Sequence, residues 1–305
     1  MVSVSPEKSI EDALASIRTP EKNSHKGQNG RLLVIGGSSI FHAASIWAAE
    51  AASRIVDMVH YSSTKENNEI MLQLKSRFID GIVIHQKDLL SYVEEDDCIL
   101  IGPGMERGEI SDEVKSKDYS FEDISSLENE ADYTYALIRF LIKNYPKKKF
   151  VFDAAALQVM EPEWLLALEE KPILTPHCKE FETLFSVSLC DLPLEEKRVM
   201  LMSTAKKYRC VILFKQITDI VTDGTTSIAI TGGNAGLTKG GTGDVLAGVT
   251  AALYTKNTPI TSAIIASFLI KKSAEDLFIS SGLLYNSSDL ISQLPSTAKQ
   301  VLFDN

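Results

Sequence analysis

The strongest candidate for chemistry in this sequence is a glycine-rich loop that ends in a carboxylate, Gly240-Gly241-Thr242-Gly243-Asp244. Glycines at these positions let backbone N–H groups converge on one anion. A helix is expected to start directly after the loop, over Val245–Tyr254, and its N-terminus would favour negative charge. Asp244 could cap that helix or take a proton from a hydroxyl group, and the glycine cluster favours the second role. We therefore predict a phosphate cradle with Asp244 as the base of a nucleotide-consuming reaction.

The loop matches neither of the two commonest nucleotide-binding motifs. No Gly-Lys-Ser or Gly-Lys-Thr follows the glycines, so the loop is not a P-loop. The chain also lacks a G-x-G-x-x-G pattern, which excludes the usual dinucleotide fingerprint.

The elements that must position this loop alternate along the chain. Apolar segments bounded by glycine or polar residues predict strands, and longer apolar-rich segments predict helices. The main expected strands are Arg31–Ile35, Met58–Ser62, Asp97–Ile101 and Lys149–Asp153, and the main expected helices are Ala43–Val56 and Tyr135–Lys143. Thr218–Thr222 and Ser227–Thr231 flank Asp223-Gly224, which predicts a hairpin. This alternation is typical of an α/β fold with a mostly parallel sheet covered by helices on both faces.

Glycine-rich and polar residues repeatedly follow the expected strands, at the sheet edge where ligands of such folds bind. No linker divides the chain, so we expect a single domain over residues 1–305. Residues 106–132 are acidic and polar with few apolar anchors, which predicts a surface insertion or a mobile loop.

Composition narrows the classes of partner. The net charge of −10 argues against nucleic acid or an anionic membrane as a partner. No segment reaches the roughly 20 apolar residues that span a bilayer, and the N-terminal sequence does not resemble a signal peptide. The four cysteines are far apart, which predicts neither a disulfide nor a zinc site and favours a reducing cytoplasm. The histidine spacing predicts no metal site caged by protein ligands.

A longer ordered set of motifs resembles one known family. The segment GNAGLTKGGTGDVLAG at 233–248 is similar to the pattern G-N-P-G-M-x-x-G-G-T-G-D-V-L-A-G of the ADP-dependent NAD(P)H-hydrate dehydratases, which have a ribokinase-like fold. The resemblance continues, in the family's order, through HKGQNGRLLVIGGS at 25–38, ILIGPG at 99–104, VFDAAAL at 151–157, LTPHCKEF at 174–181 and DLISQLP at 289–295. It implies a ribokinase-like three-layer sandwich.

The resemblance also implies a reaction, in which ADP or ATP phosphorylates the hydroxyl of hydrated NADH or NADPH and elimination restores the reduced ring. Asp244 matches the family's base, and Gly241, Thr242 and Gly243 match its anion hole. Ala44, Gly104 and His177, together with Asp244, match positions that contact the hydrated dinucleotide. Without the resemblance, Gly104 could simply form a turn and His177 could be a bonded loop histidine.

Further positions match the family's adenine-nucleotide site, namely Lys215, Gln216, Ile217, Thr218, Asp219 and Gly243. Lys215 alone could equally be a solvated lysine at a strand end. The resemblance implies Mg²⁺ as the partner of the nucleotide phosphates, with no metal held tightly by protein ligands. It also implies a homo-oligomer, with the tetramer common among relatives. The epimerase domain that many relatives carry has no counterpart in this sequence.

Several positions depart from the family pattern. Gln216 stands where the family has glycine, and Ala155 replaces the second aspartate of D-A-D-A-L. His42-Ala43-Ala44 replaces T-G-A, and Cys178-Lys179 replaces the Pro-Gly of T-P-H-P-G-E. These departures leave the glycine loop and Asp244 intact.

Two alternative functions stay open. A ribokinase-like kinase acting on a vitamin precursor or sugar alcohol would share the Gly-x-Gly-Asp loop and release a stable phosphorylated product. A catalytically impaired nucleotide-binding protein would bind adenine nucleotide without turnover. The lead-in from Asn234 and the LTPH motif favour the dehydratase.

Overall fold

A nine-stranded sheet forms the centre of the computed structural model, which describes residues 6–304. The strands lie in the order β3-β2-β1-β4-β5-β6-β7-β8-β9. Their bounds are β1 Arg31–Ile35, β2 Met58–Ser62, β3 Gly81–Val83, β4 Cys98–Ile101, β5 Lys149–Phe152, β6 Ile173–Leu174, β7 Val211–Phe214, β8 Asp219–Thr222 and β9 Ser227–Ile230.

The first seven strands are parallel, and β8 pairs antiparallel with both β7 and β9. The predicted parallel sheet and the hairpin around Asp223-Gly224 are thus confirmed. The chain adds β2 and β3 on one side of β1 and then returns to place β4 on its other side. Ligands of doubly wound sheets bind beyond the strand ends at such a reversal.

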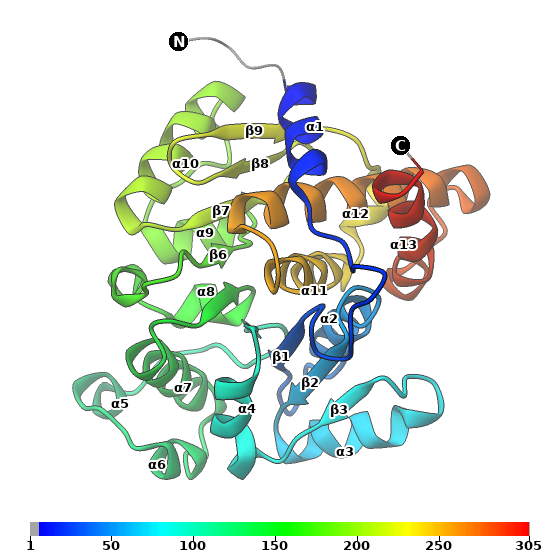
Figure 1. Cartoon of the computed structure of the whole chain (residues 1–305). Coiled ribbons are helices and arrows are strands. Elements are labelled where there is room, and N and C mark those ends of the chain that lie inside the picture. The colour runs from blue at the N-terminus through cyan, green and yellow to red at the C-terminus, as the bar shows by residue number, and fades with distance from the viewer. Residues whose placement is uncertain (1–5, 305) are drawn as a thin grey trace.

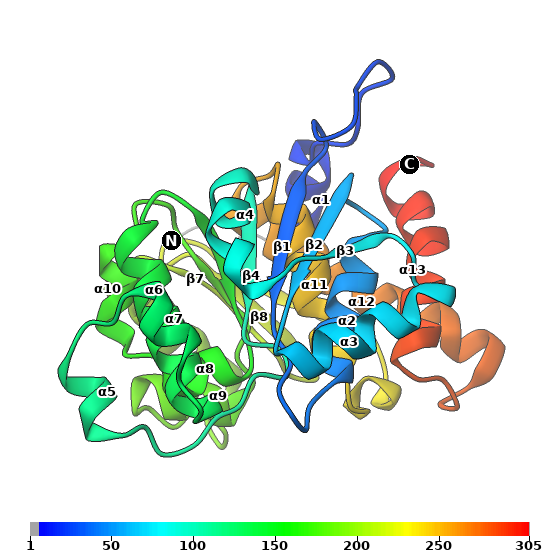
Figure 2. The same ribbon diagram turned by 90° about the horizontal axis from the view of Figure 1, so that it is seen from below.

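Helices cover both faces of the sheet, and Figure 2 shows the three layers side by side. Helices α2, α11, α12 and α13 lie on one face, and α7 to α10 lie on the other, as Figure 1 also shows. Their bounds are α1 Pro6–Ser16, α2 Ala43–Ala52, α3 Lys65–Gln73, α4 Leu89–Glu95, α5 Asp112–Ser116, α6 Phe121–Ser125, α7 Glu130–Asn144, α8 Ala155–Val159, α9 Cys178–Phe185, α10 Leu194–Tyr208, α11 Thr242–Tyr254, α12 Pro259–Ser281 and α13 Ser287–Leu302.

Each buried strand contributes to two cores because successive side chains point to opposite faces. In β1, Leu32 and Val34 join the core under α2 and α11, whereas Leu33 and Ile35 join the core on the opposite face. Strands that are buried on both faces require continuous apolar sequence, as in RLLVI. The expected three-layer arrangement is therefore confirmed.

Close packing against α2 sets the position of α11, the helix that begins at the glycine loop. A Cβ atom at Gly248 would lie 2.2 Å from the carbonyl oxygen of Ala48, so only glycine permits this approach. Every residue from Val245 to Tyr254 is buried. The helix therefore has almost no freedom to shift, and the loop at its N-terminus is anchored to the core.

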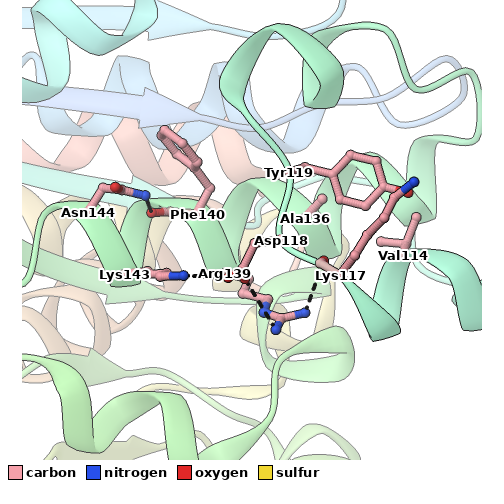
Figure 3. Close-up of a pocket in the computed structure, with 9 residues that line it drawn as sticks. All are labelled: Val114, Lys117, Asp118, Tyr119, Ala136, Arg139, Phe140, Lys143 and Asn144. Carbon is pink, nitrogen blue, oxygen red and sulfur yellow. Dashed lines mark hydrogen bonds and ion pairs between the residues drawn. The ribbon is translucent and has the colours of Figure 1, made fainter.

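The acidic segment 106–132 is folded, and the expectation that it has few apolar anchors is wrong. It contains α5 and α6 and buries Ile110, Val114, Phe121 and Ile124. Beside it lies a small cavity of about 160 Å³. Figure 3 shows this cavity, where Arg139 lies 3.3 Å from Asp118 Oδ1 and donates to the carbonyl oxygen of Lys117 at 3.4 Å. Scattered apolar residues at irregular spacing anchor this segment, and they form no periodic pattern in the sequence.

The prediction that the cysteines form no disulfide is also wrong. Cys178 and Cys190 are joined, with their Cα atoms 5.7 Å apart, while Cys98 and Cys210 are buried free thiols. The pairing arises because the chain turns back after α9, a long-range effect that spacing alone does not reveal. The disulfide removes one of the reasons, the wide spacing of the cysteines, for expecting a reducing cytoplasm. Within residues 6–304, no helix is both long and apolar enough to cross a membrane.

Candidate active site

Two glycine turns meet at the point where the strand order reverses, after β1 and β4. The N–H of Gly37 donates to the carbonyl of Pro103 at 2.8 Å, which joins the two turns. Gly104 has a φ of 71°, and a Cβ atom there would lie 2.8 Å from the carbonyl oxygen of Phe41 and 3.1 Å from Cβ of Ala44. Gly104 and Ala44, both predicted to contact the dinucleotide, are therefore neighbours on one wall.

The predicted phosphate loop forms the N-terminus of α11. Gly241 is the N-cap residue with a φ of 94°, a conformation that favours glycine, and no side chain caps the helix. Asp244 lies in the first turn, so the alternative that it serves as the helix cap does not hold. Within residues 6–304, the N–H groups of Gly241 and Gly243 donate to no protein acceptor. Free N–H donors at a helix N-terminus are suited to bind an anion.

Thr242, the remaining residue of the predicted anion hole, faces away from such a ligand. Its hydroxyl donates to the carbonyl oxygens of Leu237 at 2.6 Å and Lys239 at 2.9 Å. The side chain therefore closes the loop internally, and the anion donors are main-chain groups.

An ammonium group lies between carboxylates next to the loop. Lys215, which follows β7, places its Nζ 2.8 Å from Oδ1 of Asp153 and 3.7 Å from Oε2 of Glu180. A Cβ atom at Gly243 would lie 3.5 Å from the same Nζ, so the ammonium sits beside the loop. Lys215 is only 17% exposed, which excludes the alternative of a solvated lysine at a strand end.

This cluster sets the proton affinity of Asp244. Burial raises the pKa of Asp244 to about 7; the negative charge of Asp153 adds to the rise, while the Lys215 ammonium opposes it. Burial lowers the pKa of Lys215, but the charges of Asp153 and Glu180 outweigh this and raise it above its ordinary value. Lys215 therefore stays protonated, while Asp244 can exchange a proton near neutral pH.

His177 begins α9 with a reciprocal pair of hydrogen bonds. Its Nδ1 accepts from the N–H of Glu180 at 3.2 Å, and Glu180 Oε2 accepts from the N–H of His177 at 2.8 Å. The ring is half exposed and borders a cavity of about 650 Å³ beside the loop. His177 is thus a bonded histidine whose ring lines this cavity, and its contact with the hydrated dinucleotide stays a prediction.

A cavity of about 650 Å³ lies against the loop, between the β7–β8 turn and α12. Of the predicted nucleotide residues, Lys215, Gln216, Ile217, Asp219 and Gly243 line it, whereas Thr218 does not. Ile217 is 93% exposed, an unusual state for an isoleucine and one that a ligand in this cavity could cover.

The β7–β8 turn is held by a buried ion pair that the sequence did not indicate. Lys271 Nζ lies 3.6 Å from Oδ1 of Asp219 and donates to the carbonyl oxygens of Gln216 at 3.3 Å and Ile217 at 2.8 Å. Asp219 also accepts from the Gln216 N–H at 2.8 Å. These bonds fix the main chain on one wall of the cavity.

The comparisons with known proteins agree with this arrangement. A family model described as NAD(P)H-hydrate dehydratase matches residues 32–296. The chain belongs to the NAD(P)H-hydrate dehydratase family. It is 30% identical over 289 residues to the ADP-dependent (S)-NAD(P)H-hydrate dehydratase of Nitrosopumilus maritimus, covering 93% of each chain.

Two further relatives extend the comparison. The chain is 30% identical over 293 residues to a bifunctional NAD(P)H-hydrate repair enzyme of Methanocaldococcus jannaschii, covering 94% of this chain and 51% of that protein. It therefore spans about half the length of that relative. The ADP/ATP-dependent NAD(P)H-hydrate dehydratase of Bacillus subtilis, co-crystallized with ATP/Mg²⁺, superposes with a TM-score of 0.76 at 22% identity over 96% of this chain and 97% of that one. A ribokinase-like superfamily protein of Enterococcus faecalis superposes with a TM-score of 0.77 at 21% identity over 96% of this chain and 94% of that one, which confirms the fold expected from the sequence.

The departures from the NAD(P)H-hydrate dehydratase pattern have local explanations. Gln216 has a negative φ, so a side chain causes no backbone strain there, and its Oε1 accepts from Lys197 Nζ at 3.2 Å. Ala155 is buried at the start of α8. The retained carboxylate, Asp153, pairs with Lys215, so the charge partner nearest the loop is present.

Sequence reasoning missed several polar groups of the site. Asp153 and Glu180 lie within motifs that resemble the family, and this resemblance was the only sequence signal for them. Nothing in the sequence indicated that both carboxylates lie next to Lys215. Thr175 donates to Asp153 Oδ1 at 2.7 Å. Lys271, in the middle of α12, carried no local signal at all.

Proposed function

We propose that this chain repairs hydrated NADH and NADPH. The ring hydroxyl of the hydrate is phosphorylated at the expense of ADP or ATP, and loss of phosphate then restores the dihydronicotinamide. The observation that supports this most is the placement of Asp244 beside free main-chain donors, with a pKa of about 7. Such a carboxylate is suited to act as a general base at neutral pH.

Asp244 would take the proton from the ring hydroxyl as the oxygen attacks the phosphoryl group. The N–H groups of Gly241 and Gly243 would stabilise the charge that develops on the transferred phosphoryl oxygens. Lys215, protonated and beside the loop, would add positive charge at the same place. Elimination of the phosphate then breaks the ring C–O bond, and the adjacent ring carbon loses a proton to solvent as the C=C bond forms. The hydroxyl oxygen leaves within the phosphate, so the ring is dehydrated.

The two substrates would approach from different sides of the loop. The 650 Å³ cavity next to Lys215, Gln216 and Ile217 fits the adenine nucleotide. The wall formed by Gly104 and Ala44 would hold the hydrated dinucleotide, and His177, which lines the 650 Å³ cavity, would lie between the two ligands. Thr218 and Asp219 would contribute to nucleotide binding through the main chain of the β7–β8 turn.

The residues present do not form a metal cage. Within residues 6–304, no group of three or more His, Cys, Asp or Glu side chains could hold a metal ion. Asp153 and Glu180, the nearest carboxylates, already bond Lys215. Mg²⁺ would therefore enter as the counterion of the nucleotide phosphates and not through a set of protein ligands.

The proposal also includes a cytoplasmic homo-oligomer, for which the tetramer is one form that the family resemblance suggests. A small-molecule kinase is the main alternative, because the same loop and base could phosphorylate a stable alcohol. The test is to incubate the purified protein with hydrated NADH, Mg²⁺ and ADP or ATP. We expect recovery of the 340 nm absorbance of NADH and release of inorganic phosphate in equal amounts. Recovery of a stable phosphorylated hydrate without NADH would favour the kinase, and binding without turnover would favour the impaired protein.

A further inference from the structure

The phosphate loop is bonded to the connection between α12 and α13, far along the chain. Ser287, the first residue of α13, donates its hydroxyl to the carbonyl oxygen of Gly240 at 2.8 Å. Tyr285 donates to Oδ1 of Asn234, at the start of the lead-in, at 2.7 Å. Lys239 donates to the carbonyl oxygens of Leu283, at 2.6 Å, and of Tyr285. The lead-in and the loop are thus tied to residues 283–287 at Asn234, Lys239 and Gly240.

Ser287 is the contact nearest to the predicted reaction centre. The side chain is 1% exposed, so its hydroxyl forms this bond without competition from water. The Oγ atom also lies where a Cβ atom of Gly241 would stand, at 2.6 Å, and the Trp47 ring lies at 2.3 Å from the same point. Gly241 is therefore packed against Ser287 and Trp47 on one side, which leaves only its other side open.

The bond to Gly240 determines where the next N–H group points. A trans peptide unit is planar, so its C=O and N–H point in opposite directions. When Ser287 holds the Gly240 carbonyl, the Gly241 N–H must point away from Ser287. That N–H has no protein acceptor within residues 6–304 and belongs to the anion site at the head of α11.

A peptide between two glycines is the one that most needs such a restraint. Glycine populates both signs of φ with little difference in energy, so a Gly240–Gly241 peptide can turn over easily. A reversed peptide would present a carbonyl oxygen to the phosphoryl group, replacing a favourable donor by a repulsive acceptor.

We propose that Ser287 is a positioning residue for phosphoryl transfer, which holds the Gly240–Gly241 peptide so that the Gly241 N–H faces the transferred group. This inference rests on the proposed function. Ser287 touches no substrate itself and acts only through the loop. The Tyr285–Asn234 bond and the Lys239 contacts keep Ser287 and the lead-in at a fixed separation.

The test compares Ser287→Ala with Ser288→Ala, a control at the adjacent exposed serine whose hydroxyl bonds nothing in the described chain. A second variant, Ser287→Cys, keeps the shape and weakens the donor. For both Ser287 variants we expect kcat for hydrated NADH to fall at least about tenfold, since removing one oxyanion donor outright costs about 10²–10³ in kcat. We expect the Kd for ATP, by calorimetry, and the melting temperature to stay close to wild type.

A crystal structure of Ser287→Ala makes the test independent of turnover. We expect the Gly240–Gly241 peptide to be reversed or to occupy two orientations. An unchanged single orientation, or a kcat within twofold of wild type in both variants, would overturn the positioning role. A wild-type protein that fails to restore NADH would instead refute the proposed function, and the orientation of the peptide would still decide the role of Ser287.

Discussion

Lys215 Nζ lies 2.8 Å from Asp153 Oδ1, and this contact places a permanent cation next to the helix that carries Asp244. The two residues follow the parallel strands β5 and β7, with β6 between them. Their charges act on Asp244 in opposite directions, because Asp153 raises its pKa and Lys215 lowers it. The proton affinity of Asp244 thus depends on a balance of neighbouring charges as well as on burial.

The activity should depend on pH through Asp244. A base must be unprotonated to work, and the pKa of Asp244 is raised to about 7. We therefore expect kcat/KM to rise about tenfold per pH unit below that value and to level off above it. The raised pKa of Lys215 adds no decrease on the alkaline side up to pH 9. A profile that is flat from pH 5 to 9 would contradict this assignment.

Two substitutions should move that inflection in opposite directions. Asp153→Asn removes a negative charge, so the pKa of Asp244 should fall and the inflection should move to lower pH. Lys215→Met removes the opposing positive charge, so the inflection should move to higher pH, with an additional loss of rate if Lys215 contacts the phosphates as proposed. Both profiles are measured over pH 5–9 beside wild type. Shifts of the same sign in the two variants would show that charge does not set the pKa of Asp244.

Features of the site that arise from residues close together in the sequence could be predicted, whereas features that arise from contacts between distant residues could not. The loop at 240–244 and β1 were predicted from local patterns, since glycine spacing and apolar segments act over a few residues. The short strand β3, Gly81–Val83, was missed because three residues give no measurable periodicity. Glu180 and Ser287 reach the site through contacts between distant elements, and no local pattern encodes them.

The disulfide should contribute stability without being part of the reaction. It closes a loop with a sequence separation of 12, for which the chain-entropy estimate is about 3 kcal/mol. We expect Cys190→Ala to lower the free energy of unfolding by about 2–3 kcal/mol in urea denaturation. Thiol titration of the denatured, unreduced protein should find only Cys98 and Cys210. Four reactive thiols would show that Cys178 and Cys190 are not joined.

The substitution Asp244→Asn tests the central claim most directly. The amide keeps the shape of the side chain but cannot accept a proton, so turnover of hydrated NADH should fall by about 10²–10⁴. The Kd for ATP should stay within a few-fold of wild type, because the loop amides and Lys215 are unchanged. NADH recovery at 340 nm is measured for both proteins under identical conditions. A decrease of more than a hundredfold with ATP still bound is the predicted result, and an Asp244→Asn variant that restores NADH at the wild-type rate would contradict the account.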